Sequence, residues 1–262
     1  MILNAKLGER IDFGPQLAIF RVVPDKEMIP DFKPGQFTTL GLPGTHPRCE
    51  GAKPELNPPK DPSKLILRAY SIASPPFEKD FMEFIITLVS EGTLTPRLWN
   101  LKAGDPLFLG PKITGGFIMN EVPDDKNIVF IATGTGIAPY TSMIKTFLSA
   151  KMKRHLSVFH GVRTSQDLVY RSELTALAHI NEFFHYFPII SRPKEDPIPW
   201  KKESGHVQKL WETKVLETAW KTKPTPENTH VFLCGSPGMI DSMIELLGKD
   251  GFKEQIHVER YW

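Results

Sequence analysis

Near the middle of the chain, residues 128–139 have the sequence Ile128-Val129-Phe130-Ile131-Ala132-Thr133-Gly134-Thr135-Gly136-Ile137-Ala138-Pro139. The first part is continuously apolar, which is typical of a parallel strand covered on both faces. A Gly-x-Gly turn follows, and apolar residues then recur at helical spacing. A strand, a glycine turn and a helix in this order are suited to dinucleotide binding, because the glycines let the backbone approach a pyrophosphate and the helix N-terminus attracts its charge.

This pattern has an alternative interpretation. The three-glycine fingerprint of Rossmann domains is incomplete, since Pro139 stands where the last small residue is expected. A tight strand–helix turn in any α/β domain has the same sequence features. Both interpretations therefore stay open for the turn taken alone.

Beyond residue 139 the chain alternates between strand-like and helix-like segments. We expect strands over residues 155–160, 183–190 and 229–234, and helices over residues 167–180, 207–216 and 237–247. Such alternation predicts a parallel sheet with helices on both faces.

Before residue 123 the pattern is one of short strands separated by Gly and Pro. We expect strands over residues 17–23, 36–42, 65–67, 81–89 and 106–109. This half is predicted to be an antiparallel barrel or sandwich. The polar, Pro-rich residues 44–64 are expected to form a mobile surface loop that contributes little to the core. The predicted domains are residues 1–122 and residues 123–262.

Composition excludes several classes of protein. A length of 262 residues fits one large or two medium domains, and a formal net charge of +2 gives no support for nucleic-acid binding. Two cysteines are too few for a four-cysteine iron–sulfur cluster, and without a CxxC pair we expect no metal site. We find no signal peptide and no membrane span, and we expect a cytoplasmic protein.

The segment Arg68-Ala69-Tyr70-Ser71 ends one of the predicted strands. Side chains alternate along a strand, so Arg68 and Tyr70 share a face. A guanidinium beside an aromatic ring suits a ligand with a phosphate and a flat heterocycle. Ser71 points the other way unless the strand bends or ends there. The alternative interpretation of this segment is an edge strand with an exposed Arg and a half-buried Tyr and no ligand.

A short helix is predicted shortly after Gly92, with Thr95 as its N-cap and Pro96 in its first position. The free N–H groups of a helix N-terminus bind phosphate. An ordinary capped helix beside a turn shows the same pattern.

Further candidates lie at the ends of predicted parallel strands, which gather at one edge of the sheet. Arg163 and Arg192 follow consecutive strands and form a candidate site for a 2′-phosphate, with solvated surface arginines as the alternative. Cys234 ends a third strand, where its thiol would face the same crevice; a buried structural cysteine is the alternative.

Taken together, residues 68–71, 134–139 and 234–239 and the ending Glu259-Arg260-Tyr261-Trp262 resemble the ferredoxin–NADP⁺ reductase family in order and spacing. The resemblance covers nearly the whole chain and is greatest to the bacterial branch. It implies a six-stranded antiparallel β-barrel that binds FAD, followed by an α/β domain that binds NADP(H). It further implies an enzyme, monomeric, that passes a hydride between NADP(H) and flavin and exchanges single electrons with ferredoxin or flavodoxin, bound transiently by electrostatic attraction.

The resemblance also implies roles for individual residues. Ser71, Cys234 and Glu259 would be catalytic, with Ser71 near flavin N5, Cys234 near the hydride path and Glu259 as a proton relay; an exposed carboxylate is the alternative for Glu259. The cofactor-binding residues would be Arg68, Ala69, Tyr70, Ser71, Gly92, Leu94, Thr95, Thr133, Gly134, Thr135, Gly136, Pro139, Arg163, Arg192, Gly235, Met239, Tyr261 and Trp262.

The chain departs from the family pattern in two places. His206 stands where some relatives have an Arg after a Gly, which weakens the 2′-phosphate site, and residues 44–64 form a longer loop than bacterial relatives have. Arg97, Lys102 and Lys112 flank the flavin turn and are candidates for a basic surface that docks the carrier.

Two other functions stay open. One is an NAD(P)H-dependent flavin or quinone reductase on the same fold. The other is a non-catalytic electron-transfer flavoprotein subunit, although such subunits often carry iron–sulfur cysteines that this chain lacks.

Overall fold

The computed structural model describes residues 3–26 and 29–260, and the chain divides into two compact units. The first, here called the β unit, comprises residues 1–118 together with 138–147. The second, the α/β unit, comprises residues 119–137 and 148–262.

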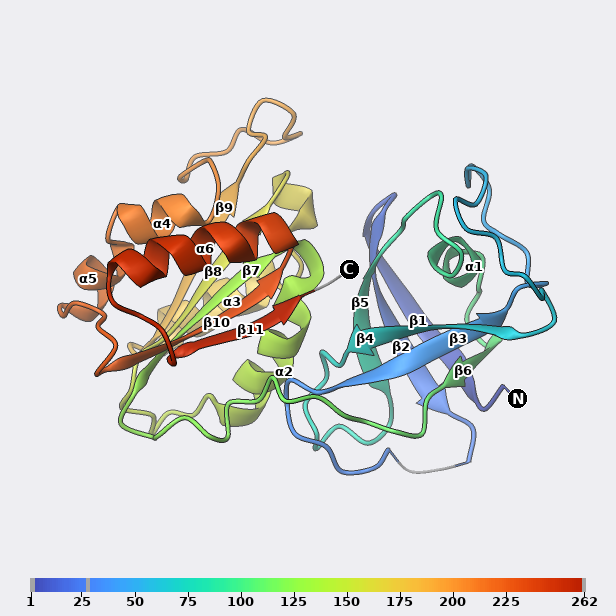
Figure 1. The fold of residues 1–262 in the computed structure, drawn as a ribbon, viewed down its shortest axis with the longest axis horizontal. Coiled ribbons are helices and arrows are strands. Elements are labelled where there is room, and N and C mark those ends of the chain that lie inside the picture. Colours follow the sequence, from blue (N-terminus) through green and yellow to red (C-terminus); the bar gives the residue numbers. More distant parts are fainter. Residues whose placement is uncertain (1–2, 27–28, 261–262) are drawn as a thin grey trace. The chain divides into compact units, whose positions relative to one another are not determined.

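The β unit contains a six-stranded antiparallel sheet, as the family resemblance implies (Figure 1). Its strands lie in the order β4-β3-β6-β1-β2-β5. Ala73, just after β4, donates its N–H to the carbonyl of Glu83 in β5 at 2.7 Å, which joins the two ends of the sheet. The strands are β1 (Ala5–Gly14), β2 (Leu17–Pro24), β3 (Phe37–Pro43), β4 (Leu65–Ser71), β5 (Met82–Thr87) and β6 (Pro106–Leu109).

The core of this unit forms from the apolar side chains that its strands direct to the inner face of the sheet. Phe20, Leu40 and Phe84 are fully buried there, and Leu98 of the short helix α1 (Thr95–Trp99) packs against the same cluster. The helix α2 (Ile137–Phe147) also belongs largely to this unit, where Ser142 Oγ donates to the Ser74 carbonyl at 2.7 Å.

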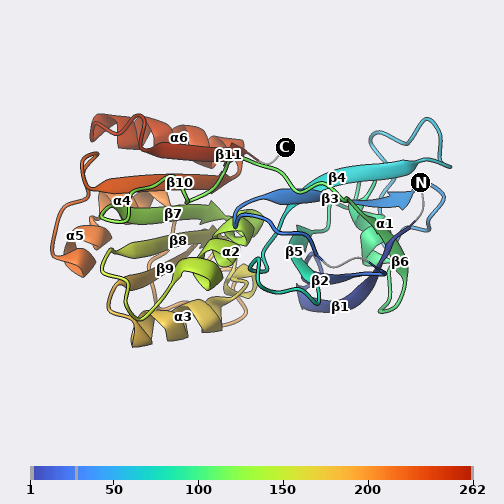
Figure 2. The same ribbon diagram turned by 90° about the horizontal axis from the view of Figure 1, so that it is seen from below.

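The α/β unit contains a five-stranded parallel sheet in the order β11-β10-β7-β8-β9. Figure 2 shows α6 and α3 on opposite sides of this sheet, as the alternation of elements predicts. The elements are β7 (Asn127–Thr133), β8 (Leu156–Val162), α3 (Arg171–Ile180), β9 (Phe184–Ile190), α4 (Gln208–Glu212), α5 (Val215–Trp220), β10 (Thr229–Gly235), α6 (Pro237–Lys249) and β11 (Ile256–Arg260).

Some elements differ from the sequence expectation. The predicted helix over residues 207–216 is interrupted at Lys214, which takes a left-handed conformation with φ 54° and separates α4 from α5. The prediction of Thr95 as an N-cap is wrong: α1 begins at Thr95, Leu94 precedes it, and the hydroxyl of Thr95 bonds the backbone of Val89 instead.

In the part of the chain that the structure describes, no helix is long and apolar enough to cross a membrane. Nor do these residues contain a group of three or more His, Cys, Asp or Glu side chains placed to hold a metal ion.

Candidate cofactor sites

The first candidate site lies in the β unit at the end of β4. Arg68 is exposed, and its guanidinium donates to the Leu67 carbonyl at 2.8 Å and to Thr93 Oγ1 at 3.2 Å. Arg68 therefore reaches from β4 to the turn that precedes α1. The structure thus brings residues 68–71 next to the turn at residues 92–95, two segments that the sequence analysis could identify only one at a time.

The neighbouring side chains of β4 differ in exposure. Tyr70 is half-buried and meets Phe84 edge-on at 6.4 Å between ring centroids. Burial raises the pKa of Tyr70, so its phenol keeps its proton at neutral pH. Ala69 is exposed, whereas Ser71 is 7% exposed and is the last residue of the strand.

The turn over residues 89–95 is closed tightly. Gly92 donates its N–H to the Val89 carbonyl at 2.8 Å, and Thr95 Oγ1 accepts from the Val89 N–H at 3.0 Å. A Cβ on Gly92 would lie 2.9 Å from the Val89 oxygen, so only glycine fits there. Leu94 buries its side chain in the core, which leaves the backbone of the turn to contact a ligand.

The second candidate site lies in the α/β unit, where the neighbouring strands β7 and β10 end. A Cβ on Gly136 would lie 2.2 Å from the Cys234 carbonyl, and one on Gly235 would lie 2.2 Å from Thr133 Oγ1. Thr133 Oγ1 also accepts from the Ser236 N–H at 3.0 Å. The two glycine loops therefore interlock, and larger residues at either glycine would force them apart.

Sequence reasoning missed a buried histidine beneath the first glycine loop. His160 Nε2 lies 3.3 Å from the Gly134 carbonyl, and His160 Nδ1 lies 3.1 Å from the Tyr186 hydroxyl. Burial lowers the pKa of His160 to about 4, so the ring is neutral at pH 7. The signal in the sequence was a titratable residue inside the predominantly apolar strand β8.

Cys234 and Glu259 lie opposite each other on the parallel strands β10 and β11. Cys234 is fully buried. Burial raises the pKa of Glu259 to about 7, and its Oε2 is buried without a hydrogen-bond partner among the described residues. Glu259 is therefore a carboxyl group that carries or releases a proton near neutral pH.

The two arginines after β8 and β9 are adjacent. Arg192 donates its backbone N–H to the Arg163 carbonyl at 2.9 Å, and both side chains are exposed. Gly205 donates its N–H to the Ile190 carbonyl at 2.8 Å, which brings the Gly205–His206 segment beside the same strand end. The backbone segments that carry Arg163, Arg192 and His206 thus lie together at the carboxyl edge of the sheet, where Arg192 also pairs with Glu195 at 3.2 Å.

Thr135 lies in the 3₁₀ turn before α2, Pro139 in the first turn of α2, and Met239 in the first turn of α6. Tyr261 and Trp262 lie outside the described residues. Lys102 and Lys112 are exposed.

The prediction of Arg97 as a docking cation is wrong. Its side chain is 6% exposed and is ion-paired with Glu55, because the loop 44–64 covers it. A buried, paired guanidinium offers no charge to a partner.

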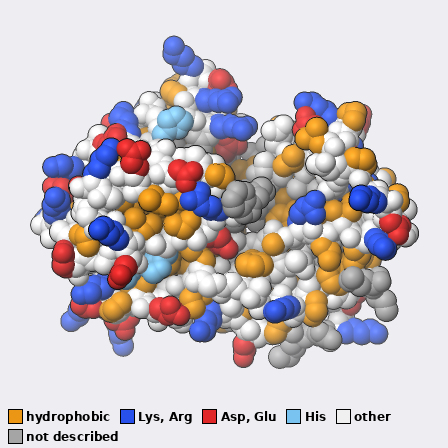
Figure 3. Space-filling model, viewed as in Figure 1, with side chains coloured by type: hydrophobic (Ala, Val, Ile, Leu, Met, Phe, Trp, Pro, Cys, Tyr) orange, Lys and Arg blue, Asp and Glu red, His pale blue; other side chains and the backbone are white. Residues whose placement is uncertain are grey.

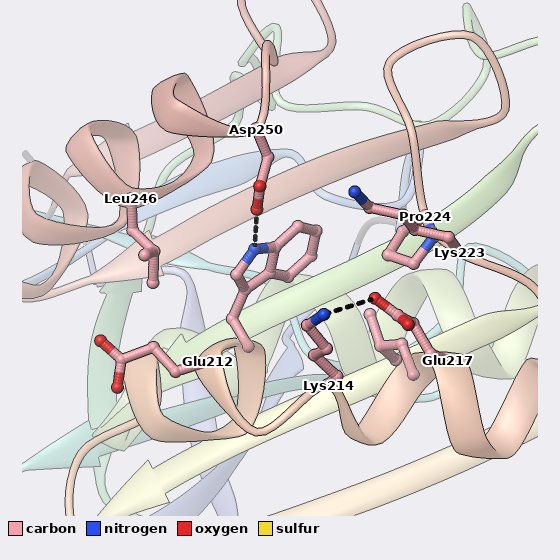
Figure 4. Close-up of a pocket in the computed structure, with 9 residues that line it drawn as sticks. Glu212, Lys214, Glu217, Lys223, Pro224, Leu246 and Asp250 are labelled. Carbon is pink, nitrogen blue, oxygen red and sulfur yellow. Dashed lines mark hydrogen bonds and ion pairs between the residues drawn. The ribbon is translucent and has the colours of Figure 1, made fainter.

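A cavity of about 290 Å³ lies elsewhere in the α/β unit, between α4, α5 and α6 (Figure 4). It shares no residue with the predicted sites. Trp211 Nε1 donates to Asp250 at 2.7 Å, and Lys214 pairs with Glu217 at 3.9 Å, so these polar groups on its wall already have partners.

Comparison with known proteins agrees with this arrangement. The family model for the oxidoreductase NAD-binding domain matches residues 130–244. The flavodoxin/ferredoxin–NADP reductase of Buchnera aphidicola subsp. Baizongia pistaciae is 33% identical over 253 residues, 93% of each protein. The ferredoxin–NADP reductase of Pseudomonas aeruginosa is 29% identical over 85% of this chain and 80% of its own length.

Among solved structures, a ferredoxin NADP⁺ reductase from Neisseria gonorrhoeae with bound FAD and NADP superposes with a TM-score of 0.81. It is 24% identical, and the match covers 99% of this chain and 98% of that one. An Amycolatopsis cytochrome P450 reductase gives a TM-score of 0.78 at 23% identity, over 98% of this chain and 69% of that one.

Proposed function

The chain belongs to the ferredoxin/flavodoxin–NADP reductase family, and we propose that it is an FAD-dependent oxidoreductase that passes a hydride between NADP(H) and flavin and single electrons to or from ferredoxin or flavodoxin. The observation that supports it most is the contact between Arg68 and Thr93, because it gathers a cation, a half-buried aromatic ring and a glycine turn at the end of β4.

The residues of the β unit fit FAD. We propose that Arg68 binds a phosphate through its guanidinium fork, that Tyr70 packs on the isoalloxazine ring, and that Ser71 lies near its N5. The turn with Gly92, Leu94 and Thr95 would hold the pyrophosphate, since a glycine without a Cβ and a backbone free of side chains suit close approach. FAD, when bound, supplies the chemistry that links a two-electron hydride donor to one-electron carriers.

The residues of the α/β unit fit NADP(H). We propose that the loops at Thr133–Gly136 and Gly235–Met239 receive the pyrophosphate and nicotinamide, supported from beneath by neutral His160. Arg163 and Arg192 would bind the 2′-phosphate, because guanidinium groups pair with phosphate through charge-assisted hydrogen bonds. The Gly205–His206 segment lies beside the same strand end.

Glu259 is proposed to hold and deliver a proton at its carboxyl group. Its pKa of about 7 is near the value at which a general acid and its conjugate base are both populated at neutral pH. The Tyr261–Trp262 tail is proposed to cover the flavin, and a truncation that ends at Tyr261 tests this. Altered flavin fluorescence supports a covering role, and unchanged FAD retention and nucleotide kinetics contradict it.

An acidic carrier is proposed to dock transiently through basic side chains that include Lys102 and Lys112. On the face drawn in Figure 3, Lys and Arg are interspersed with Asp and Glu over the α/β unit, so overall charge alone does not define a docking patch there. Carrier reduction that is insensitive to ionic strength would contradict electrostatic docking. A monomeric state and a cytoplasmic location stay predictions.

The function is tested by reduction of ferredoxin and of flavodoxin with NADPH or NADH as donor. The proposal predicts NADPH-dependent reduction of at least one carrier by the purified chain. Reduction of free flavins or quinones without carrier activity supports the alternative reductase, and absence of any NAD(P)H oxidation by the FAD-loaded chain supports the non-catalytic subunit.

A further inference from the structure

The long loop over residues 44–64 is fastened to the segment that precedes and begins α1. It joins β3 to β4 as a hairpin whose base is closed by the Gly44 N–H to the Lys64 carbonyl at 3.1 Å and the Thr45 N–H to the Pro62 carbonyl at 2.9 Å. Figure 1 shows the loop beside α1. Hydrogen bonds and an ion pair to residues 90–97 hold the loop in place, so it covers that segment.

Backbone groups of the loop bond the turn directly. The N–H of Lys53 donates to the Ser90 carbonyl and that of Leu56 to the Glu91 carbonyl, both at 3.2 Å. The N–H of Cys49 donates to the Pro96 carbonyl at 2.9 Å. These bonds extend along the turn from its start into the first turn of α1.

Two arginines complete the attachment. Arg48 Nη2 donates to the Ser90 carbonyl at 2.8 Å and to the Gly92 carbonyl at 3.2 Å. Buried Arg97 donates to the Thr93 carbonyl, and also to the Gly44 carbonyl at 2.7 Å. The carbonyls of four consecutive residues, Ser90, Glu91, Gly92 and Thr93, are therefore all held by the loop or by these arginines.

Glu55 joins the two arginines. Its carboxylate pairs with Arg97 and lies 3.7 Å from Arg48 Nε, and its side chain is only 12% exposed. A carboxylate between two guanidiniums offsets their repulsion and the cost of burying them. Glu55 is thus the central member of an Arg48–Glu55–Arg97 cluster.

The direction of these carbonyls fixes the direction of the amides. In a trans peptide the carbonyl of one residue and the N–H of the next point to opposite sides, and the described chain has no cis peptide. The amides of Thr93 and Leu94 are consequently turned away from the loop. Among residues 3–26 and 29–260, neither of these two amides donates to another protein group.

We propose that the 44–64 loop, through the Arg48–Glu55–Arg97 cluster, is a positioning element for the FAD pyrophosphate. It holds the carbonyls of residues 90–93 on one side and so presents the amides of Thr93 and Leu94, with Arg68, to the phosphates. This inference rests on the proposed function, because it assumes that the turn binds FAD. The arginines of the cluster act through the turn and do not touch the cofactor.

The test compares FAD binding to the apo-protein in variants of the loop. Arg48→Met removes the guanidinium but keeps a long apolar stem, Arg48→Lys keeps the charge without the fork, and Glu55→Gln removes the central charge. Lys64→Ala is the matched control, because the Lys64 side chain is 80% exposed and pairs with Asp61 of the same loop. Dissociation constants are measured by flavin fluorescence, below the melting temperature of every apo-protein, for FAD and for riboflavin, which has no phosphate.

The proposal predicts that Arg48→Met and Glu55→Gln weaken FAD binding about tenfold or more, the loss expected for one charge-assisted hydrogen bond. Arg48→Lys should be intermediate, Lys64→Ala unchanged, and riboflavin affinity unchanged throughout. FAD affinity within twofold of wild type in both variants, or an equal loss for riboflavin, would overturn the positioning role and leave the proposed function standing. A wild-type protein that binds no FAD would instead overturn the proposed function, and the inference with it.

Discussion

Glu259 lies opposite Cys234 across the parallel pair β10–β11, and its carboxyl group is buried with an oxygen that bonds no described residue. The pKa of Glu259 is raised from 4.5 to about 7 by this burial. A carboxyl group placed in this way stores a proton at neutral pH but destabilises the fold once it ionises.

We predict that Glu259 lowers the stability of the fold as the pH rises from about 4.5 to about 7. Below about pH 4.5 the carboxyl is protonated in both the folded and the unfolded chain, so it does not change the stability. Between about pH 4.5 and pH 7 the carboxyl ionises in the unfolded chain but stays protonated in the folded chain, so the free energy of unfolding falls as the pH rises. Each pKa unit corresponds to about 1.4 kcal/mol, so the loss is roughly 3 kcal/mol. Urea unfolding of wild type and Glu259→Gln across this range should show wild type losing stability relative to Glu259→Gln as the pH rises; parallel curves would contradict it.

His160 has the opposite effect on stability, because its ionisation lowers the free energy of unfolding as the pH falls. Its pKa falls from 6.5 to about 4 in the folded chain, so acidification below about pH 6.5 protonates the unfolded chain first and lowers stability until about pH 4. His160→Asn should reduce this acid decline by up to roughly 3 kcal/mol, although it also lowers stability at pH 7 through lost packing. Denaturant midpoints between these pH values measure it, and an unchanged pH slope would disprove the assignment.

The two glycine loops predict a contrast between Gly136→Ala and Gly238→Ala. The first adds a Cβ 2.2 Å from the Cys234 carbonyl, whereas the second adds one in open space within α6. Gly136→Ala should cost about 1–3 kcal/mol of stability and weaken NADPH binding. Gly238→Ala should be neutral or stabilise the protein by about 0.5–1 kcal/mol, since alanine favours a helix over glycine. Equal thermal midpoints for the two variants would show that the loops do not interlock.

For the 2′-phosphate, Arg163→Ala should raise the KM for NADPH about tenfold and leave that for NADH nearly unchanged. The physical reason is that only NADPH carries the phosphate which the guanidinium binds. Lys202→Ala, an exposed cation in the segment after β9, is the control. Equal losses for both nucleotides in Arg163→Ala would argue for general damage to the site.

The sequence predicted the fold wherever a periodic pattern exists. The apolar run over residues 128–132, the glycine turn and the alternating segments that follow lead directly to the parallel sheet, because strands covered on both faces need continuous apolar residues. It missed β1 and β11, whose burial patterns are mixed and less regular.

Local sequence could not reveal contacts between distant segments. Arg97 looked like a surface cation because nothing in residues 95–99 shows that residues 44–64 fold over it. The contact of Arg68 with Thr93, and that of His160 with Gly134, likewise join residues 25 or more positions apart. Such pairings depend on the closed sheet and on strand order, which a motif alone does not specify.

The central claim is most directly tested by the visible absorbance of the purified chain on anaerobic mixing with NADPH and, in parallel, with NADH. We expect a yellow protein with non-covalent FAD, whose flavin absorbance is bleached by NADPH much faster than by NADH at equal concentration. A folded protein that stays colourless after incubation with FAD, or an FAD-loaded protein whose absorbance neither nucleotide changes, would contradict it.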